Sequence, residues 1–413
     1  MKRFFRPALA VALAAAMALT LTGCWDYREV EGLQFVAGIA IDKGTSKRYL
    51  VTLELVDLTG GTQGSSTLPG KLVAADGDTI SDAVANVATN MQGDLYFNDC
   101  KLAVFSREIA KDGLTAVLDW LNRDPQPRFT MQLYISLERT AADVLKPESE
   151  DSPAVAPYIS SAMEQANSMG RNTQVCLYEA DDILWGEGMD LSLPCLKREK
   201  LPDGQSGGQS GGQSGGQSNS QPGGQAGGQA SGQASGQSKT VISGTAVFRG
   251  DRLVGYRSED QTRTDMLFTS SVHEGQFVVE AGSAAKRVSL TIRNSSSSIL
   301  PAAGPRISIS IDADCTLDEE NTSANVLLSL GTDGVERLAQ STLCANAQKE
   351  IRAVQTELGC DIFGFGREIS RKDPELWKKL KPRWGEIFRT LKVDVSARVH
   401  IDNSGYAYPK GKR

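Results

Sequence analysis

The residue types on which most enzymes depend are scarce in this chain of 413 residues. Its two histidines, His273 and His400, stand on different segments, and neither has a cysteine or carboxylate at the spacing of a metal site. The metalloprotease pattern HExxH and the phosphate-binding pattern GxxxxGKS/T do not occur. We therefore expect no catalytic residue, no metal ligand and no bound cofactor.

Two other patterns have a simpler interpretation than chemistry. Gly364-Phe365-Gly366 has two glycines of a dinucleotide-binding loop, but Ile369 stands where the third is needed, and the pattern follows a long helix instead of a strand. The acidic runs Asp181-Asp182 and Asp318-Glu319-Glu320 are typical of solvated faces or helix starts, where acids complement the helix dipole.

Cys24 has the clearest chemistry in the chain. A positive segment, an apolar core at residues 9–21 and the small Gly23 precede it, in the order of a secretory signal, and the core is too short to span a bilayer. The positive residues are Lys2, Arg3 and Arg6. Leu21-Thr22-Gly23-Cys24 resembles the bacterial lipobox, in which the cysteine sulfur receives a diacylglycerol before cleavage. We predict a cleaved signal at 1–23 and lipid attachment at Cys24, so that the bilayer is a partner; the alternative is an ordinary signal with an incidental cysteine.

The composition suits a globular protein of two or three domains, with 40% hydrophobic and 23% charged residues. Without the signal, 41 basic and 50 acidic residues remain, a net charge of −9, which disfavours nucleic acid and anionic lipid headgroups as partners. Six further cysteines allow about 15 disulfide pairings, and none forms a CxxC pair, so we interpret most of them as small buried hydrophobes. They are Cys100, Cys176, Cys195, Cys315, Cys344 and Cys360.

A low-complexity stretch divides the chain. Residues 204–238 are almost entirely Gly, Gln, Ser and Ala, which leave nothing apolar to bury. We predict a disordered Gly/Gln/Ser linker at 201–238 that marks a boundary between an N-terminal domain at 24–200 and a C-terminal domain at 239–413.

Hydrophobic periodicity predicts mixed sheets with packed helices in both halves, an α+β, multi-domain fold. In the first half we expect a hairpin of strands 35–41 and 49–56, strands 102–105, 129–137 and 191–196, and helices 80–91, 114–121, 140–145, 154–169 and around 183–185. In the second half we expect strands 241–249, 252–256, 276–280, 288–293, 307–314 and 393–401, and a long helix at 335–358.

A last helix is predicted to begin at Pro374 and to carry Trp377 and Trp384. The two tryptophans stand seven residues apart and so share one helix face. We interpret them as packing against the sheet in preference to forming a ligand site.

Several segments, taken in order, resemble one family. Cys24-Trp25-Asp26-Tyr27-Arg28-Glu29, followed by a strand that ends in Ile41-Asp42, resembles the start of the Ger(x)C lipoproteins, the GerAC-like C subunits of spore germinant receptors. Further matches are Ser192-Leu193-Pro194, Gly244-Thr245-Ala246-Val247-Phe248, Leu253-Val254-Gly255-Tyr256, Asp361-Ile362-Phe363-Gly364-Phe365-Gly366, Trp377, Trp384 and Val393-Asp394-Val395.

This resemblance implies a non-enzymatic subunit with several α/β subdomains, needed for the response to nutrient germinants. It would lie on the outer face of the inner spore membrane, beside the integral membrane A and B subunits of the receptor. The motif or interaction residues that it marks are Trp25, Asp26, Arg28, Glu29, Asp361, Phe363, Gly364, Gly366, Trp377 and Trp384. Trp25 and Tyr27 either contact the interface or a partner, or simply pack on the first strand.

Two functions of other classes compete with this one. An extracytoplasmic solute-binding lipoprotein would show a large cleft with convergent polar groups between its halves. An exported hydrolase would need a nucleophile clustered with His273 or His400.

Overall fold

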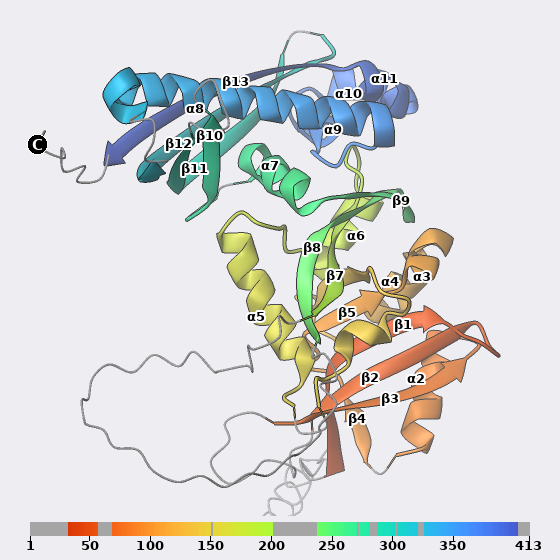
Figure 1. The fold of residues 1–413 in the computed structure, drawn as a ribbon. Coiled ribbons are helices and arrows are strands. Elements are labelled where there is room, and N and C mark those ends of the chain that lie inside the picture. Colours follow the sequence, from red (N-terminus) through yellow and green to blue (C-terminus); the bar gives the residue numbers. More distant parts are fainter. Residues whose placement is uncertain are drawn as a thin grey trace, which may run out of the picture.

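A computed structural model describes residues 32–56, 68–91, 93–149, 152–200, 238–270, 272–280, 287–302, 304–320 and 326–403. Cys24, the adjoining motif residues Trp25, Asp26, Arg28 and Glu29, and linker residues 201–237 lie outside these ranges. Within them the chain forms two stacked units, one built on a sheet of nine strands and the other on a sheet of four (Figure 1).

The first unit contains most of the N-terminal half. Its strands are β1 (Leu33–Lys43), β2 (Tyr49–Val56), β3 (Gly70–Gly77), β4 (Asp94–Tyr96), β5 (Leu102–Phe105), β6 (Gln132–Ser136), β7 (Ser192–Lys200), β8 (Ser238–Arg249) and β9 (Arg252–Arg257). Its helices are α2 (Ile80–Thr89), α3 (Arg107–Asp112), α4 (Thr115–Arg123), α5 (Val155–Ser168) and α6 (Leu177–Trp185), with a 3-10 turn at Ala142–Leu145.

This sheet is mixed and is covered on both faces. Parallel strands β1, β5, β6 and β7 form its centre, and antiparallel strands extend it on both sides, β2 and β3 beyond β1, β8 and β9 beyond β7. Helices α2, α3, α4 and α6 bury one face, while α5 and the 3-10 turn bury the other. The result is a three-layer unit, as expected for central parallel strands that need cover on both sides.

Side chains on the sheet close the ends of helices above it. Glu54 on β2 is fully buried, and its carboxylate accepts hydrogen bonds from the backbone N–H groups of Val155 and Ala156, at the start of α5. The N-terminal N–H groups of a helix have no partner within the helix, so this carboxylate stabilises α5 and fixes its position on the sheet. Thr79 has the same role locally at the start of α2, where it accepts from the N–H of Asp82.

The low-complexity stretch does not separate the two sheets. Its flanking residues Lys200 and Ser238 face each other as register partners of antiparallel β7 and β8. Strands β8 and β9 come after the stretch, in the segment predicted to open the C-terminal domain, yet they complete the sheet of the first unit. Residues 201–237 therefore connect two neighbouring strands of one sheet.

The second unit contains the rest of the C-terminal half. Its elements are α7 (Glu259–Thr269), β10 (Gln276–Glu280), β11 (Arg287–Ala302), β12 (Arg306–Glu320), α8 (Val326–Ala353), a π-helical segment (Val354–Leu358), α9 (Phe365–Lys372), α10 (Pro374–Leu380), a 3-10 turn (Lys381–Arg383), α11 (Trp384–Thr390) and β13 (Lys392–Asn403). The sheet order is β10-β11-β12-β13, with only the β12–β13 pair parallel. In the described ranges, no helix is both long and apolar enough to cross a membrane.

The α+β, multi-domain fold predicted from periodicity is confirmed, and so are most of its strands. The single last helix is wrong, because a 3-10 turn at Lys381–Arg383 divides it into α10 and α11. Pro382 lies within this turn, where its ring and missing N–H interrupt the helical hydrogen bonds. Strands β3 and β4 and helices α3, α7 and α9 were not predicted from periodicity.

Candidate functional site at the junction between the units

The motif Asp361–Gly366 lies between the π-helical segment and α9, where the second unit meets the first. Gly359 and Gly364 on either side of its start have positive φ angles of 62° and 73°. A residue with a Cβ resists this left-handed conformation by about 1–2 kcal/mol. The two glycines therefore allow the backbone to turn just before the motif and again within it. These turns bring Asp361 to the start of α9.

Asp361 is the buried centre of the motif, with 1% of its surface exposed. Its carboxylate accepts from the backbone N–H of Phe365 at 3.1 Å, the N–H of Gly366 at 2.8 Å and the indole Nε1 of Trp384 at 3.1 Å. Burial raises the pKa of Asp361 to about 7, although the hydrogen bonds from Gly366 and Phe365 act to lower it. The carboxylate thus occupies the helix N-terminus where a bound phosphate would lie in a dinucleotide-binding loop.

The loop of the first unit between α6 and β7 forms hydrogen bonds with the motif. Asp190, between α6 and β7, exchanges two hydrogen bonds with Asp361: its Oδ2 accepts from the N–H of Asp361 at 2.7 Å, and its own N–H donates to the carbonyl of Asp361 at 2.8 Å. Burial raises the pKa of Asp190 as well. Since these residues are 171 positions apart, the contact joins the two halves of the chain.

Two glycines make backbone-to-backbone contact at this point. The N–H of Arg367 donates to the carbonyl of Gly188 at 2.8 Å. A Cβ on Gly188 would lie 2.3 Å from the carbonyl carbon of Gly366, and one on Gly366 would lie 2.8 Å from the Cα of Gly188. Gly188 also has a φ of +76°. Both positions need glycine because no side chain fits between the two segments.

The two tryptophans pack here and also donate hydrogen bonds. Their rings meet edge to face with centroids 5.3 Å apart. Trp384 donates to Asp361, and Trp377 donates through Nε1 to Glu187 of the α6–β7 loop at 2.7 Å. Hydrogen bonding by Lys381 and then by Trp377 lowers the pKa of Glu187. The predicted packing role of the pair is confirmed, since Trp377 belongs to the core of the second unit, and the polar edges of both rings are hydrogen-bonded at the junction.

Phe363 continues the apolar part of the junction. It contacts Phe268 of α7 and Phe365 of α9, with ring centroids 5.2 and 5.3 Å apart. All three rings are buried, and each contributes about 1.5–3 kcal/mol relative to an exposed position. The motif positions Asp361, Phe363, Gly364, Gly366, Trp377 and Trp384 therefore come together in one region of the structure.

A buried ion cluster that the sequence did not reveal forms a second connection. The guanidinium of Arg257 on β9 makes two 2.9 Å hydrogen bonds to Asp265 on α7 and one of 2.9 Å to Glu350 on α8. Burial raises the pKa of Asp265 to about 6, against the lowering effect of Arg257. Desolvation acts to lower the pKa of Arg257, but both carboxylates outweigh it and raise this pKa. An isolated arginine near the end of a strand gives no local signal of such a role.

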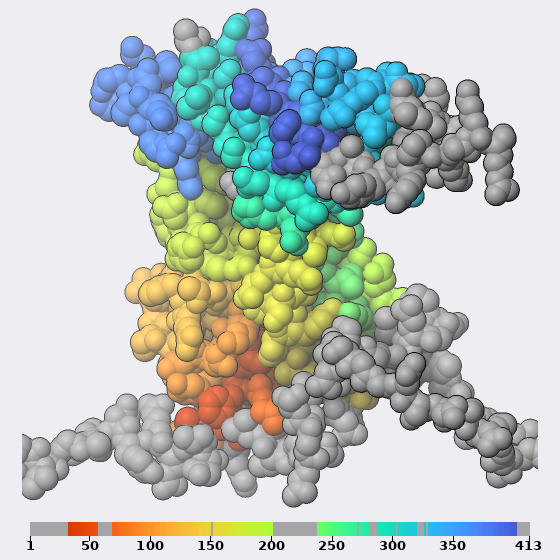
Figure 2. Space-filling view, turned by 90° about the vertical axis from the view of Figure 1, so that its left-hand side faces the viewer, coloured from red at the N-terminus to blue at the C-terminus, as the bar shows by residue number. Residues whose placement is uncertain are grey.

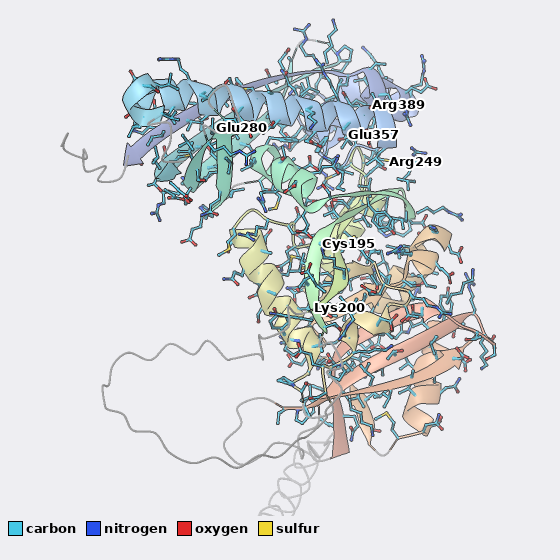
Figure 3. The ribbon with its side chains drawn as sticks, viewed as in Figure 1. Cys195, Lys200, Arg249, Glu280, Glu357 and Arg389 are labelled. Carbon is cyan, nitrogen blue, oxygen red and sulfur yellow. The ribbon has the colours of Figure 1, made fainter. Side chains whose placement is uncertain are left out.

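The β8–β9 hairpin contacts both units directly. Asp251 at its turn accepts from the hydroxyl of Thr115 at 2.7 Å, at the start of α4. Arg249 at the end of β8 donates to the carbonyl of Leu358, at the end of the π-helical segment, at 2.7 Å. Figure 3 labels Arg249 together with Glu357 and Arg389 in this region. The hairpin is thus part of the first sheet and also a support for the second unit.

This arrangement joins segments of the two units by hydrogen bonds. All the described cysteines are free thiols, mostly buried as predicted, and burial raises the pKa of Cys100 to about 12. In the described ranges, no group of three or more His, Cys, Asp or Glu side chains is placed to hold a metal ion.

Two described grooves lie within the second unit. One, of about 800 Å³, is lined by β10, β11 and α8, including Glu280 (Figure 3), and the other, of about 340 Å³, lies between α8 and the start of β13. Neither lies between the two units, where a two-lobed solute-binding protein holds its ligand.

Comparison with known proteins places both halves of the chain in one group. Residues 26–198 match the family model "Spore germination protein N-terminal domain", and residues 243–405 match "Spore germination B3/ GerAC like, C-terminal". The chain is 23% identical to "Spore germination protein KC" of Bacillus subtilis (strain 168), over 97% of this chain and 96% of that protein. It is 22% identical to "Spore germination protein B3" of the same organism, over 93% and 95%.

The fold has a solved counterpart. A crystal structure of the GerBC protein matches with a TM-score of 0.50 and 16% identity, over 89% of this chain and 97% of that one. At this identity the likeness shows the fold alone. Because the two family models together match most of the chain, this protein belongs to the GerAC-like family of spore germination proteins.

Proposed function

We propose that this protein is the lipid-anchored, non-enzymatic C subunit of a spore germinant receptor, needed for the response to nutrient germinants. The observation that carries the proposal is the match of both halves to a single family of spore germination proteins. The C-terminal model includes the motif around Asp361, and the structure shows this motif in contact with the N-terminal half.

The anchor follows from the order of signal, Gly23 and Cys24. Two acyl chains hold a protein stably on a membrane, whereas one is marginal. We infer that the protein lies on the outer face of the inner spore membrane, with integral membrane A and B subunits as its partners. Trp25, Asp26, Arg28 and Glu29 follow the anchor directly and are the motif residues nearest to the bilayer in sequence.

The absence of enzymatic activity is supported by how the motif residues are used. The carboxylate of Asp361 is buried and accepts three hydrogen bonds from the protein itself, so it is not available to a substrate. Cysteines with raised pKa values are poor nucleophiles at neutral pH. The junction residues therefore serve to hold the two units in a fixed arrangement.

Affinity purification of the tagged protein from detergent-solubilised spore membranes tests this function. We expect two polytopic membrane proteins to copurify. Cys24→Ala is expected to abolish lipid labelling and to release the protein from the membrane fraction, because the anchor is lost. The matched control is Cys344→Ala, which removes a half-buried free thiol on α8 and should leave labelling and fractionation unchanged.

The outcomes separate the competing functions. If the protein is recovered without membrane partners but with a bound small molecule, the hypothesis of a solute-binding lipoprotein replaces that of a receptor subunit. A Cys24→Ala protein that stays in the membrane with its lipid label would refute the anchor.

A further inference from the structure

We propose that helices α9–α11 form a docking surface for an acidic segment of a protein partner. Residues 365–390 contain eight basic and four acidic residues, a net charge of +4, whereas the rest of the chain has 36 basic and 46 acidic residues. The negative charge of the whole chain therefore conceals a local surface of the opposite sign.

The positive charges lie on the outside of these helices. The side chains of Arg371, Lys378 and Arg383 are 67%, 72% and 75% exposed. Among the described residues, each pairs with a glutamate three positions away in sequence, and such exposed pairs are weak and easily exchanged. Lys372 and Lys379 have no carboxylate partner among the residues that the structure describes. We call the exposed set the basic cap: Arg371, Lys372, Lys378, Lys379, Lys381 and Arg383.

An exposed tryptophan borders the basic cap. Trp185, the last residue of α6, is 74% exposed. The neighbouring Asp182 pairs with Arg367 of α9 at 3.2 Å, and Glu187 in the following loop pairs with Lys381 of the cap. Tryptophan is enriched among the residues that dominate binding energy at protein interfaces. The partner segment should therefore carry apolar as well as acidic side chains.

The position of the cap argues against the bilayer as its occupant, a step that rests on the proposed anchor. The described chain begins at Gly32, and the red N-terminal part lies at the opposite end of the molecule from blue α9–α11 (Figure 1, Figure 2). Cys24 precedes Gly32 by eight residues, which span at most about 28 Å. A short tether at that end leaves the cap pointing away from the membrane.

The four carboxylates within the segment argue against nucleic acid. Glu368, Asp373, Glu375 and Glu386 interrupt the positive surface and would repel a continuous run of phosphates. A peptide can place its acidic residues against the cations and avoid these positions.

A binding assay on the full lipidated chain in phosphatidylcholine nanodiscs tests the proposal. The probes are two fluorescent peptides, four repeats of Glu-Glu-Leu and four repeats of Glu-Glu-Ser, followed by anisotropy. The test variant is Lys378→Gln/Lys379→Gln/Arg383→Gln, and the matched control is Lys71→Gln/Lys111→Gln/Arg252→Gln, the same change of charge at exposed positions of the first unit.

We expect the test variant to bind both peptides at least tenfold more weakly, and the control to bind as the wild type does. Trp185→Ala should weaken binding of the Glu-Glu-Leu peptide but not that of the Glu-Glu-Ser peptide. The proposal is overturned if both triple variants lose binding equally, or if neither does. It is also overturned if the discs capture phosphatidylglycerol vesicles or duplex DNA more tightly than the peptides. None of these outcomes depends on recovery of receptor subunits, so the proposed function stands or falls separately.

Discussion

At the scale of single residues, buried carboxylates hold helix ends in both units. Glu54 accepts from the first N–H groups of α5, and Asp361 accepts from the first N–H groups of α9. Burial raises the pKa of each to about 7, above the usual 4.5 of glutamate and 3.8 of aspartate. Desolvation of the charged form is the main cause in both residues.

These raised pKa values predict how stability depends on pH. The folded protein retains protons that the unfolded chain has released, so the stabilisation present below about pH 4 is lost as pH rises through about 7. Each group can contribute a slope of up to about 1.4 kcal/mol per pH unit in that range. Glu54→Gln and Asp361→Asn should each flatten the decrease, measured as the free energy of unfolding in urea from pH 4 to 8.

The exposed Glu108→Gln on α3 is a suitable control. This variant makes the same chemical change as Glu54→Gln, at a solvent-exposed position that caps no helix in the described part of the chain. A slope that Glu54→Gln and Asp361→Asn leave unchanged would show that neither carboxyl titrates differently on folding.

Half of the junction was identifiable from the sequence. Asp361, Gly364, Gly366 and the two tryptophans stand in a motif that resembles a known family. Their contact residues in the first unit, such as Gly188 and Asp190, belong to no recognisable sequence motif. Their contacts are made with residues more than 170 positions away, so the local sequence does not indicate them. The predicted motif residues before Gly32 remain predictions.

At the scale of elements, the pairing of β7 with β8 shows that the low-complexity stretch connects two strands of one sheet instead of separating the two sheets. Composition indicates a segment with nothing apolar to bury, but it carries no information on where the two ends meet. They meet at the Lys200–Ser238 pair, within one sheet. The same limit applies to α10 and α11, where periodicity continues across Pro382 although the helix does not.

Replacement of residues 201–237 by Asn-Gly should therefore preserve the fold and stabilise it. A two-residue Asn-Gly turn suits an antiparallel pair. Shortening a loop of 37 residues to two lowers the entropic cost of closure by about 2–3 kcal/mol. Urea unfolding of the full chain should show a higher urea concentration at the midpoint. The slope of the unfolding free energy against urea concentration should be unchanged.

A lower midpoint after this replacement would contradict the interpretation of the stretch as a hairpin connection. A scrambled stretch of the same length and composition is the control, and it should unfold as the wild type does.

At the scale of the whole molecule, the two units are joined at several places by residues far apart in sequence. Gly188 meets Gly366 backbone to backbone, Arg257 pairs with Glu350, and Arg249 donates to the carbonyl of Leu358. The second unit follows β9, a strand of the first sheet, so the chain itself also connects them. We infer that the two units unfold together as one body.

Scanning calorimetry of the full chain in detergent tests this central claim most directly. The wild type should unfold in a single transition. Gly188→Ala should lower the transition temperature and separate it into two, since a Cβ at a φ of +76° costs about 1–2 kcal/mol and also collides with Gly366. Gly385→Ala on α11, where an added Cβ meets nothing within 4 Å, is the matched control and should keep one transition. Two transitions in the wild type, or a Gly188→Ala protein that unfolds like the control, would contradict the account.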